Sequence, residues 1–256
     1  MRWHSLIWPG LAALVSLAIL STLGIWQLQR LAWKNDLTAR IEARAYGEPS
    51  PLPPVSAWGR FSTEEDGYRR VRLTGTFLHD RETAVHGLMS ASRGQPVQGF
   101  YILTPLRLSD GGEVVVNRGF VPTELRDPAT RAAGQIPGEV TVTGLMRGPE
   151  ERTAFVPEND PARERWFTRD VAAIAAARGL ERAAPFIVDA DATPVPGGWP
   201  RGGQTILRLP NNHLQYAMTW FGIAATLIGV FAAFAWRRLR GREDEPPLTA
   251  AERNRG

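Results

Sequence analysis

The sequence predicts a membrane-anchored α+β protein, in which two transmembrane helices flank an extracytoplasmic, antiparallel β-rich domain that forms a partial barrel. Three observations lead to this fold class. Two charge-free apolar segments lie towards the ends of the 256-residue chain, and several segments of alternating polarity lie between them. Only one further segment has clear helix start and stop signals. We therefore do not expect a wholly soluble protein.

The two apolar segments are long enough to span a bilayer. Residues 6–26 and 214–236 contain 21 and 23 residues without a charged side chain. At about 1.5 Å per residue, each covers a hydrocarbon core of roughly 30 Å. The first segment is longer than the apolar part of a signal peptide, and no small-residue cleavage site follows it. We expect it to be retained as a membrane anchor.

Basic residues predict the orientation of the spans. Four arginines follow the second segment: Arg237, Arg238, Arg240 and Arg242. This cluster favours a cytoplasmic tail over residues 237–256, and with two spans it places both termini in the cytoplasm. Arg30 and Lys34 after the first span disagree mildly, but a domain as long as residues 27–213 translocates largely regardless of its charge. Because the arginine, alanine and proline bias suggests a GC-rich bacterial genome, we expect a periplasmic domain on a bacterial inner membrane.

The middle of the chain is expected to form a small sheet. Residues 70–77 alternate apolar and polar side chains, as in a half-buried strand. Further strands are expected at residues 82–88, 100–108, 113–120, 139–146 and 185–188. The turn residues 109–112 predict a hairpin, and Pro105 favours an edge strand or a bulge within the strand that contains it.

Two other segments have local signals. Residues 48–54 contain four prolines and are expected to form an extended linker. Asp170 can cap a helix in which Val171 and Ile174 form part of an apolar stripe, and Gly179 is a typical stop.

Several kinds of chemistry are disfavoured by what the sequence lacks. The chain has no cysteine, no Gly-x-Ser-x-Gly motif and no phosphate-binding loop around Lys34. The basic excess is concentrated beside a membrane span, so we expect no nucleic acid partner. His79 and His86 are a weak alternative for a metal site, because no third ligand accompanies them. Without a general-base pair or a redox centre, we expect no enzymatic activity.

His213 is the strongest candidate for binding chemistry. It follows Asn211 and Asn212, either of which can cap the second apolar helix. A helix N-terminus disfavours the imidazolium ion, and neutral imidazole is the form that binds a metal. Tyr216 and Trp220 follow at i+3 and i+7 with the small Ala217 between them, so we expect one aromatic face. That face suits a flat, apolar, iron-bearing ring, or alternatively packs against the first span.

The outer end of the first span adds two more residues. Gln27 and Arg30 lie three residues apart, and if the spans pack together they approach His213. Arg30 would then clamp a carboxylate such as a haem propionate, or alternatively anchor to lipid phosphate.

Six motifs in order resemble the Surfeit locus protein 1 family, which assists assembly of cytochrome c oxidase. The resemblance spans almost the whole chain and rests on these segments: Leu23–Lys34 with Gly24, Trp26, Gln27, Arg30 and Trp33; Gly99 with Thr104-Pro105; Val116–Pro122; Gly144-x-x-Arg147; Asn159-x-Pro161 with Trp166 and Asp170; and Asn211–Trp220.

The resemblance implies an inner-membrane assembly factor that receives haem a and assists its insertion into subunit I. It also implies that His213 is the iron ligand, and it makes haem a synthase a candidate partner beside subunit I and the lipid bilayer. A scaffold that stabilises subunit I intermediates without touching haem is the alternative. For Asn117-Arg118-Gly119 we favour a structural interpretation, a hairpin strand with a bulge at Gly119.

Overall fold

The computed structural model describes residues 4–89, 96–205, 207 and 211–240, and the chain divides into two compact units. The helical unit contains residues 1–37 and 209–256, and the β-rich unit contains residues 38–208. Most of the expected tail, residues 241–256 with Arg242, lies outside the described residues.

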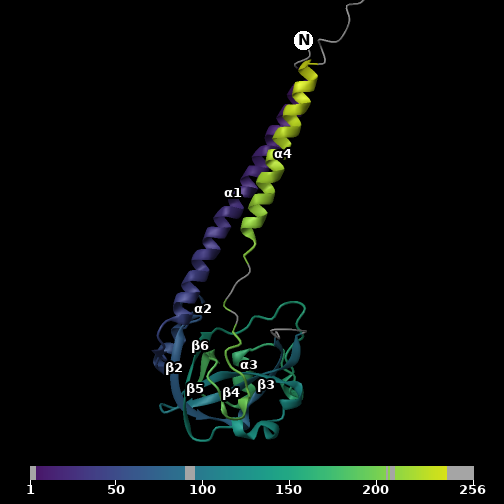
Figure 1. The fold of residues 1–256 in the computed structure, drawn as a ribbon. Helices are drawn as coiled ribbons and strands as arrows, with labels where there is room; N and C mark the ends of the chain where they lie inside the picture. Colours follow the sequence, from purple (N-terminus) through teal and green to yellow (C-terminus); the bar gives the residue numbers. More distant parts are fainter. Residues whose placement is uncertain (1–3, 90–95, 206, 208–210, 241–256) are drawn as a thin grey trace, which may run out of the picture. The chain divides into compact units, whose positions relative to one another are not determined.

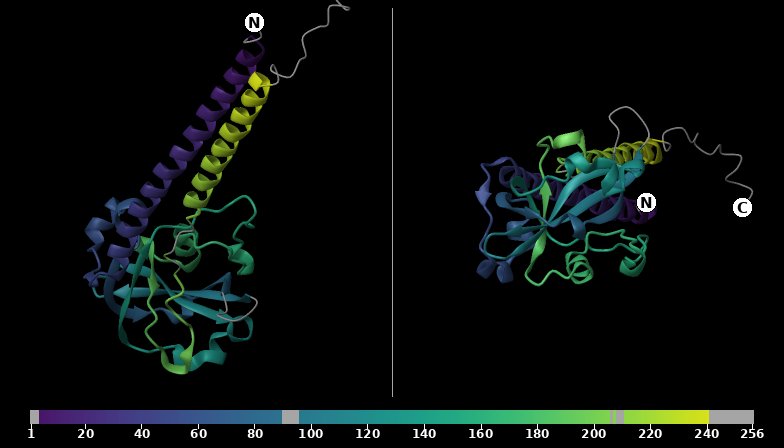
Figure 2. Two further views of the ribbon diagram at one scale, coloured as in Figure 1. Left: turned by 45° about the horizontal axis from the view of Figure 1, so that its top comes forward. Right: turned by 90° about the horizontal axis from the view of Figure 1, so that it is seen from below.

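The helical unit contains α1 (His4–Tyr46), up to residue 37, and α4 (His213–Arg240). Figures 1 and 2 show these two helices side by side. Both are long and apolar enough to cross a membrane. Helix α1 continues beyond the apolar stretch that ends at residue 26 and enters the β-rich unit without a break.

The less exposed residues of the two helices follow a seven-residue repeat. On α4 they are His213, Ala217, Trp220, Ala224, Leu227, Phe231 and Phe234, and on α1 they include Gly10, Leu17, Gly24, Gln27 and Leu31. Spacings that alternate between four and three residues keep one seam of each helix facing its partner. Small residues in this seam allow close approach, since a Cβ on Gly24 would lie 2.6 Å from the ring of Phe221.

Away from the seam, the helices expose large apolar side chains. Examples are Trp8, Leu14, Met218 and Val230, which are between 63% and 76% exposed. A helix pair with apolar outer faces is typical of a segment whose solvent is lipid.

The β-rich unit is built on a seven-stranded sheet. Its strands are β1 (Ser50–Pro51), β2 (Arg70–Phe77), β3 (Thr83–Met89), β4 (Val97–Leu108), β5 (Glu113–Pro122), β6 (Glu139–Arg147) and β7 (Ala183–Ala190). Their order is β1-β2-β6-β7-β5-β4-β3, and an additional β2–β4 pairing closes five of them into a partial barrel. Most neighbours are antiparallel, whereas β1–β2 and β5–β7 are parallel. The expected architecture, two long apolar helices flanking a β-rich domain that forms a partial barrel, is confirmed.

Side chains alternate between the inside and the outside of this barrel. Val71, Leu73 and Phe77 of β2 point into a core that also contains Phe186. On the outer face, α3 (Val171–Arg178) packs with Ile174 and the fully buried Trp166 against alternate residues of β4, β5 and β7. Full burial of one such apolar side chain contributes roughly 1.5–3 kcal/mol. The residues that point inward therefore pack against one another in the barrel core, whereas those that point outward pack against α3 and Trp166. Helix α3 covers only part of the outer face.

The expected local signals mostly correspond to elements. Strand β2 has the expected bounds, and the Asp170 side chain accepts the Ala173 N–H at 3.0 Å to cap α3. Gly179 ends α3 with φ +61°. The proline-rich segment contributes β1, and a short helix, α2 (Thr63–Asp66), follows before β2.

Pro105 does not mark an edge strand, because β4 has neighbours on both sides. One side of β4 pairs with β5 throughout, while the other side pairs with β3 up to Leu103 and with β2 from Leu106. Pro105 lies between these two partners, where a missing N–H breaks no ladder bond. A bulge does occur in the β4–β5 pair beside Leu103, but its extra residue is on β5, so the alternative of a bulge within the strand that contains Pro105 is also wrong.

That bulge involves the Asn117-Arg118-Gly119 segment. Leu103 pairs with Asn117 and Ile102 pairs with Gly119, so Arg118 is the extra residue. Gly119 has φ +116°, and a Cβ there would overlap the carbonyl of Arg201. The expected bulge is therefore confirmed, and it allows residues 120 and 201 to exchange backbone hydrogen bonds.

Candidate functional site

His213 is the first residue of α4 and lies on the seam that faces α1. The carbonyl of Asn212 accepts the N–H of Tyr216 at 3.2 Å, so Asn212 occupies the N-cap position. Asn211 donates instead to Asn35 of α1, from Nδ2 to Oδ1 at 2.9 Å. This amide pair lies beside the start of α4 and ties it to α1.

Gln27 and His213 form a direct hydrogen bond across the seam. Nδ1 of His213 lies 2.6 Å from Oε1 of Gln27, which is only 8% exposed. An amide oxygen can only accept, so Nδ1 of His213 is the donor in this pair, and a neutral ring oriented in this way has its lone pair on Nε2.

This arrangement is the one that orients a metal-binding histidine. Such a histidine usually donates its second ring N–H to an oxygen acceptor, which fixes both the tautomer and the ring plane. A hydrogen bond of this kind contributes about 0.5–1.5 kcal/mol to stability. Gln27 is therefore a positioning residue for the Nε2 atom of His213.

The remaining aromatic residues of the candidate site are divided between two faces of α4. Trp220 and the buried Ala217 lie on the seam with His213, whereas Tyr216 is 54% exposed. The sequence-based expectation put all of these on one face, and the structure divides them because the seam follows the i+4 and i+7 positions. Part of this face packs against α1, as the alternative interpretation holds, while the Tyr216 ring is accessible.

Arg30 lies one turn beyond Gln27 on α1 and is exposed. Its guanidinium group lies 3.9 Å from the centre of the Trp33 ring. Stacking uses the face of the guanidinium group and leaves its N–H edges available for a carboxylate or phosphate. The structure is therefore compatible with both roles that the sequence suggests for Arg30.

The donor set limits which metal groups this site can hold. Within the described residues, no group of three or more His, Asp or Glu side chains gathers around a common point. A bare zinc or similar ion takes three or four protein ligands, whereas haem brings its own equatorial nitrogens and needs one axial ligand. A lone, oriented imidazole therefore fits haem better than it fits a free ion.

Sequence reasoning missed Asn35 and named Gly24 only as a motif residue, without its packing role. Asn35 pairs with Asn211 over 176 positions of the chain, and Gly24 provides the space for Phe221. Gly24 carries a signal, because a glycine at the seam spacing of an apolar helix is typical of close helix packing. Asn35 carries none, since polar residues are common after a membrane span.

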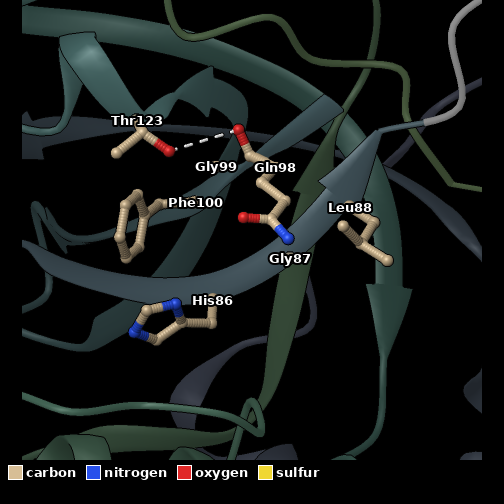
Figure 3. Close-up of a pocket in the computed structure, with 7 residues that line it drawn as sticks. All are labelled: His86, Gly87, Leu88, Gln98, Gly99, Phe100 and Thr123. Atoms are coloured by element: carbon tan, nitrogen blue, oxygen red, sulfur yellow. Dashed lines mark hydrogen bonds between the residues drawn. The ribbon is translucent and has the colours of Figure 1, made fainter. Parts of the chain in front are cut away.

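The two other expected histidine candidates lie in the β-rich unit. His86 lies beside a hollow of about 440 Å³ that is also lined by Phe100, Gln98 and Thr123 (Figure 3). Its ring is stacked on Phe167, with centres 5.1 Å apart. Burial, together with Arg126 and Arg165, lowers the pKa of His86. His79 contacts the carbonyl of Ile136 at 2.9 Å, and neither histidine belongs to a metal cluster among the described residues.

Comparison with known proteins identifies relatives that cover most of the chain. The sequence profile of the SURF1 family matches residues 14–225. A SURF1-like protein of Monosiga brevicollis is 41% identical over 229 residues, which cover 86% of this chain and 85% of the relative. Surfeit locus protein 1 of Homo sapiens is 42% identical over 216 residues, covering 79% of this chain and 69% of the relative. The protein of that name from Takifugu rubripes is 38% identical over 251 residues, covering 91% and 97%.

Proposed function

The chain belongs to the SURF1 family, and from this premise we propose that it is a non-enzymatic assembly factor for cytochrome c oxidase, which receives haem a and assists its insertion into subunit I. The family motifs named above support the assembly role. The haem role depends on the chemistry of His213.

One observation carries the haem proposal, namely the hydrogen bond from Nδ1 of His213 to Gln27. It leaves Nε2 as the ligand atom and holds the ring plane, so little rotational freedom is lost when Nε2 binds iron.

The other candidate residues have complementary roles in this proposal. When bound, haem supplies the equatorial nitrogens, the iron and an apolar ring. Trp220 would lie against the ring on the face that carries His213, Tyr216 would offer its exposed ring on the neighbouring face, and Arg30 would bind a propionate through its N–H edges. The lipid bilayer would surround the rest of α1 and α4. Haem a synthase is the partner that would deliver the cofactor.

We further propose a bacterial inner membrane location with both termini in the cytoplasm. Arg237, Arg238 and Arg240 lie in the last turn of α4, at the end opposite His213. Because basic residues flanking a span favour the cytoplasmic side, His213 would lie near the outer surface, and the β-rich unit would be periplasmic.

The test uses the full-length protein purified after coexpression with the haem a biosynthetic enzymes. We expect a Soret absorption band in the wild type and its loss in His213→Ala. His86→Ala is the matched control, since it removes a histidine from the β-rich unit, and it is expected to retain the band. Equal haem content in wild type and His213→Ala would remove His213 from the site and reject the haem proposal.

A scaffold that contacts subunit I without haem is the second candidate, and the edge of the sheet favours it. Among the described strands, β3 pairs only with β4; the middle of its other edge is covered where the His86 N–H donates to the Trp166 carbonyl at 2.8 Å, and Leu88 near its end is 59% exposed. An unpaired strand end with an exposed apolar side chain is a common protein-binding surface. Copurification of subunit I with a haem-free full-length protein would support this candidate, and loss of subunit I in His213→Ala would contradict it.

A further inference from the structure

A polar cavity of about 230 Å³ lies in the β-rich unit, wholly outside the helical site. Four neighbouring strands each contribute one side chain to it: Tyr101 from β4, Asn117 from β5, Asp189 from β7 and Arg147 from β6. Arg169, just before α3, also lines the cavity. Asn117 and Asp189 lie two residues beyond Val115 and Ile187, so they share the outer face that α3 covers further along.

Asp189 is the centre of this cavity. It is 3% exposed and accepts hydrogen bonds from Asn117 Nδ2 and from Thr205 Oγ1, both at 2.8 Å. Arg147 and Arg169 each approach it at 3.5 Å. Four donors therefore share two carboxylate oxygens, which use all of the acceptor positions that a carboxylate has.

The two arginines differ in the contacts that they make besides those to Asp189. Charge-assisted N–H···O bonds are usually about 2.7–2.9 Å long, so contacts of 3.5 Å hold both guanidinium groups only weakly to Asp189. Arg147 makes one such contact and otherwise stacks over Tyr68 at 4.5 Å. Arg169 donates its Nε to Glu150 at 3.0 Å. A guanidinium group has five N–H donors, so both arginines keep donors that do not contact Asp189 and can bind another acceptor.

The charges around the cavity balance only when Glu150 outside its lining is counted. Two guanidinium groups face one buried carboxylate, and Glu150 supplies the second negative charge through Arg169. The Glu150 side chain is 44% exposed, and ion pairs in contact with water contribute little. An anion in the cavity would therefore compete with Glu150 for Arg169.

Tyr101 adds a neutral donor to the same wall. Its hydroxyl group donates to the carbonyl of Leu88 at 3.4 Å, which is a long hydrogen bond. Burial raises the pKa of this phenol, so it remains an O–H donor at neutral pH. The ring can lie flat against the strand because the neighbouring position is Gly87, where a Cβ would lie 2.5 Å from the ring.

We propose that this cavity is a binding site for the carboxylate group of a small organic anion, held by Arg147 and Arg169. An anion that takes the place of the single Glu150 carboxylate suits a monoanion better than a doubly charged phosphate, and planar guanidinium groups match the plane of a carboxylate. Asn117 and Asp189 are positioning residues in this site. The proposal does not depend on haem binding at His213.

The first test requires no variant. Full-length protein in detergent is titrated with acetate and with acetamide, its uncharged isostere, at constant ionic strength maintained with chloride. Isothermal titration calorimetry is expected to show saturable binding of acetate and none of acetamide. Equal responses to the two compounds, or tighter binding of inorganic phosphate than of acetate, would overturn the proposal.

The second test assigns the binding to the two arginines. Arg147→Gln and Arg169→Gln are each expected to weaken acetate binding at least tenfold, because each removes a charge-assisted donor. Arg72→Gln replaces an exposed arginine of β2 and is the matched control, expected to bind like the wild type. Acetate binding that is unchanged in both cavity variants, with the fold intact by circular dichroism, would also overturn the proposal.

Discussion

The helical unit and the β-rich unit bury polar groups in different ways. Across the seam of the helical unit, Gln27 and His213 pair through one hydrogen bond in which neither partner is a carboxylate or a guanidinium group. The β-rich unit buries ions instead: Arg131 and Glu82 pair with side chains 2% and 7% exposed, and Asp189 has two arginine neighbours. Burial even lowers the pKa of Arg118 to about 10. The difference follows from the solvent, because lipid-facing helices tolerate hydrogen-bonded neutral groups far better than charges.

Breaking the buried ion pair gives the largest expected effect. Arg131→Met leaves the Glu82 carboxylate buried without its partner and is expected to lower the free energy of unfolding by about 3–5 kcal/mol. Urea denaturation followed by tryptophan fluorescence measures this change. The double variant Glu82→Leu with Arg131→Met should recover most of the loss. A single variant within about 1 kcal/mol of the wild type would show that the Glu82 carboxylate does not need its arginine partner.

Breaking the hydrogen bond between Gln27 and His213 tests the helical unit in the same way. Gln27→Leu leaves His213 in place but removes its acceptor, so haem affinity is expected to fall about 10- to 100-fold with only a small change in stability. Haem titration followed by Soret absorbance measures the affinity. Gln29→Leu, at an exposed position of the same helix, should bind haem like the wild type. Equal affinities for the two variants would show that Gln27 does not position His213.

A smaller effect is expected where a charged group meets water at a helix end. Asp170→Ala removes the side chain that caps α3 and should lower the free energy of unfolding by about 1 kcal/mol. Asp170→Asn keeps an oxygen acceptor and is expected to lose less. Thermal unfolding of the full chain compares the two variants, and equal losses would indicate that charge rather than capping stabilises this end.

The smallest effect concerns pH. Because the pKa of His86 is lowered in the folded protein, the unfolded chain binds its proton more tightly. Stability is therefore expected to be complete above the unfolded pKa of about 6.5 and to decrease as the pH falls below it. His86→Gln should reduce this slope in denaturation curves between about pH 5 and 8. A slope of the opposite sign would contradict the environment described for His86.

Much of the fold could be predicted from local patterns. Alternation of polarity predicted β2 with its observed bounds, and Asp170 with Gly179 predicted α3. The parallel pairing of β5 with β7 was not predictable, because it joins strands separated by β6. The continuation of α1 to Tyr46 was also missed, since polar residues after a span do not indicate whether a helix ends.

The candidate site also contains some features that the sequence predicts and others that it does not. His213, Tyr216 and Trp220 belong to one helix, so their spacing was available from the sequence, although the partly buried seam excludes Tyr216. The bond between His213 and Gln27 joins residues 186 positions apart. Asn117, Arg147 and Asp189 likewise meet only because strands β5, β6 and β7 are in one register.

The sequence alone determined which segments are apolar enough for a membrane, which residues share a face and where single elements start and stop. These properties depend on neighbours within one or two turns of the chain. Only the tertiary structure decided that Gln27 accepts from His213 and that two arginines share Asp189. Such pairings depend on helix rotation and strand register, which are set by how whole elements pack and which no local pattern encodes.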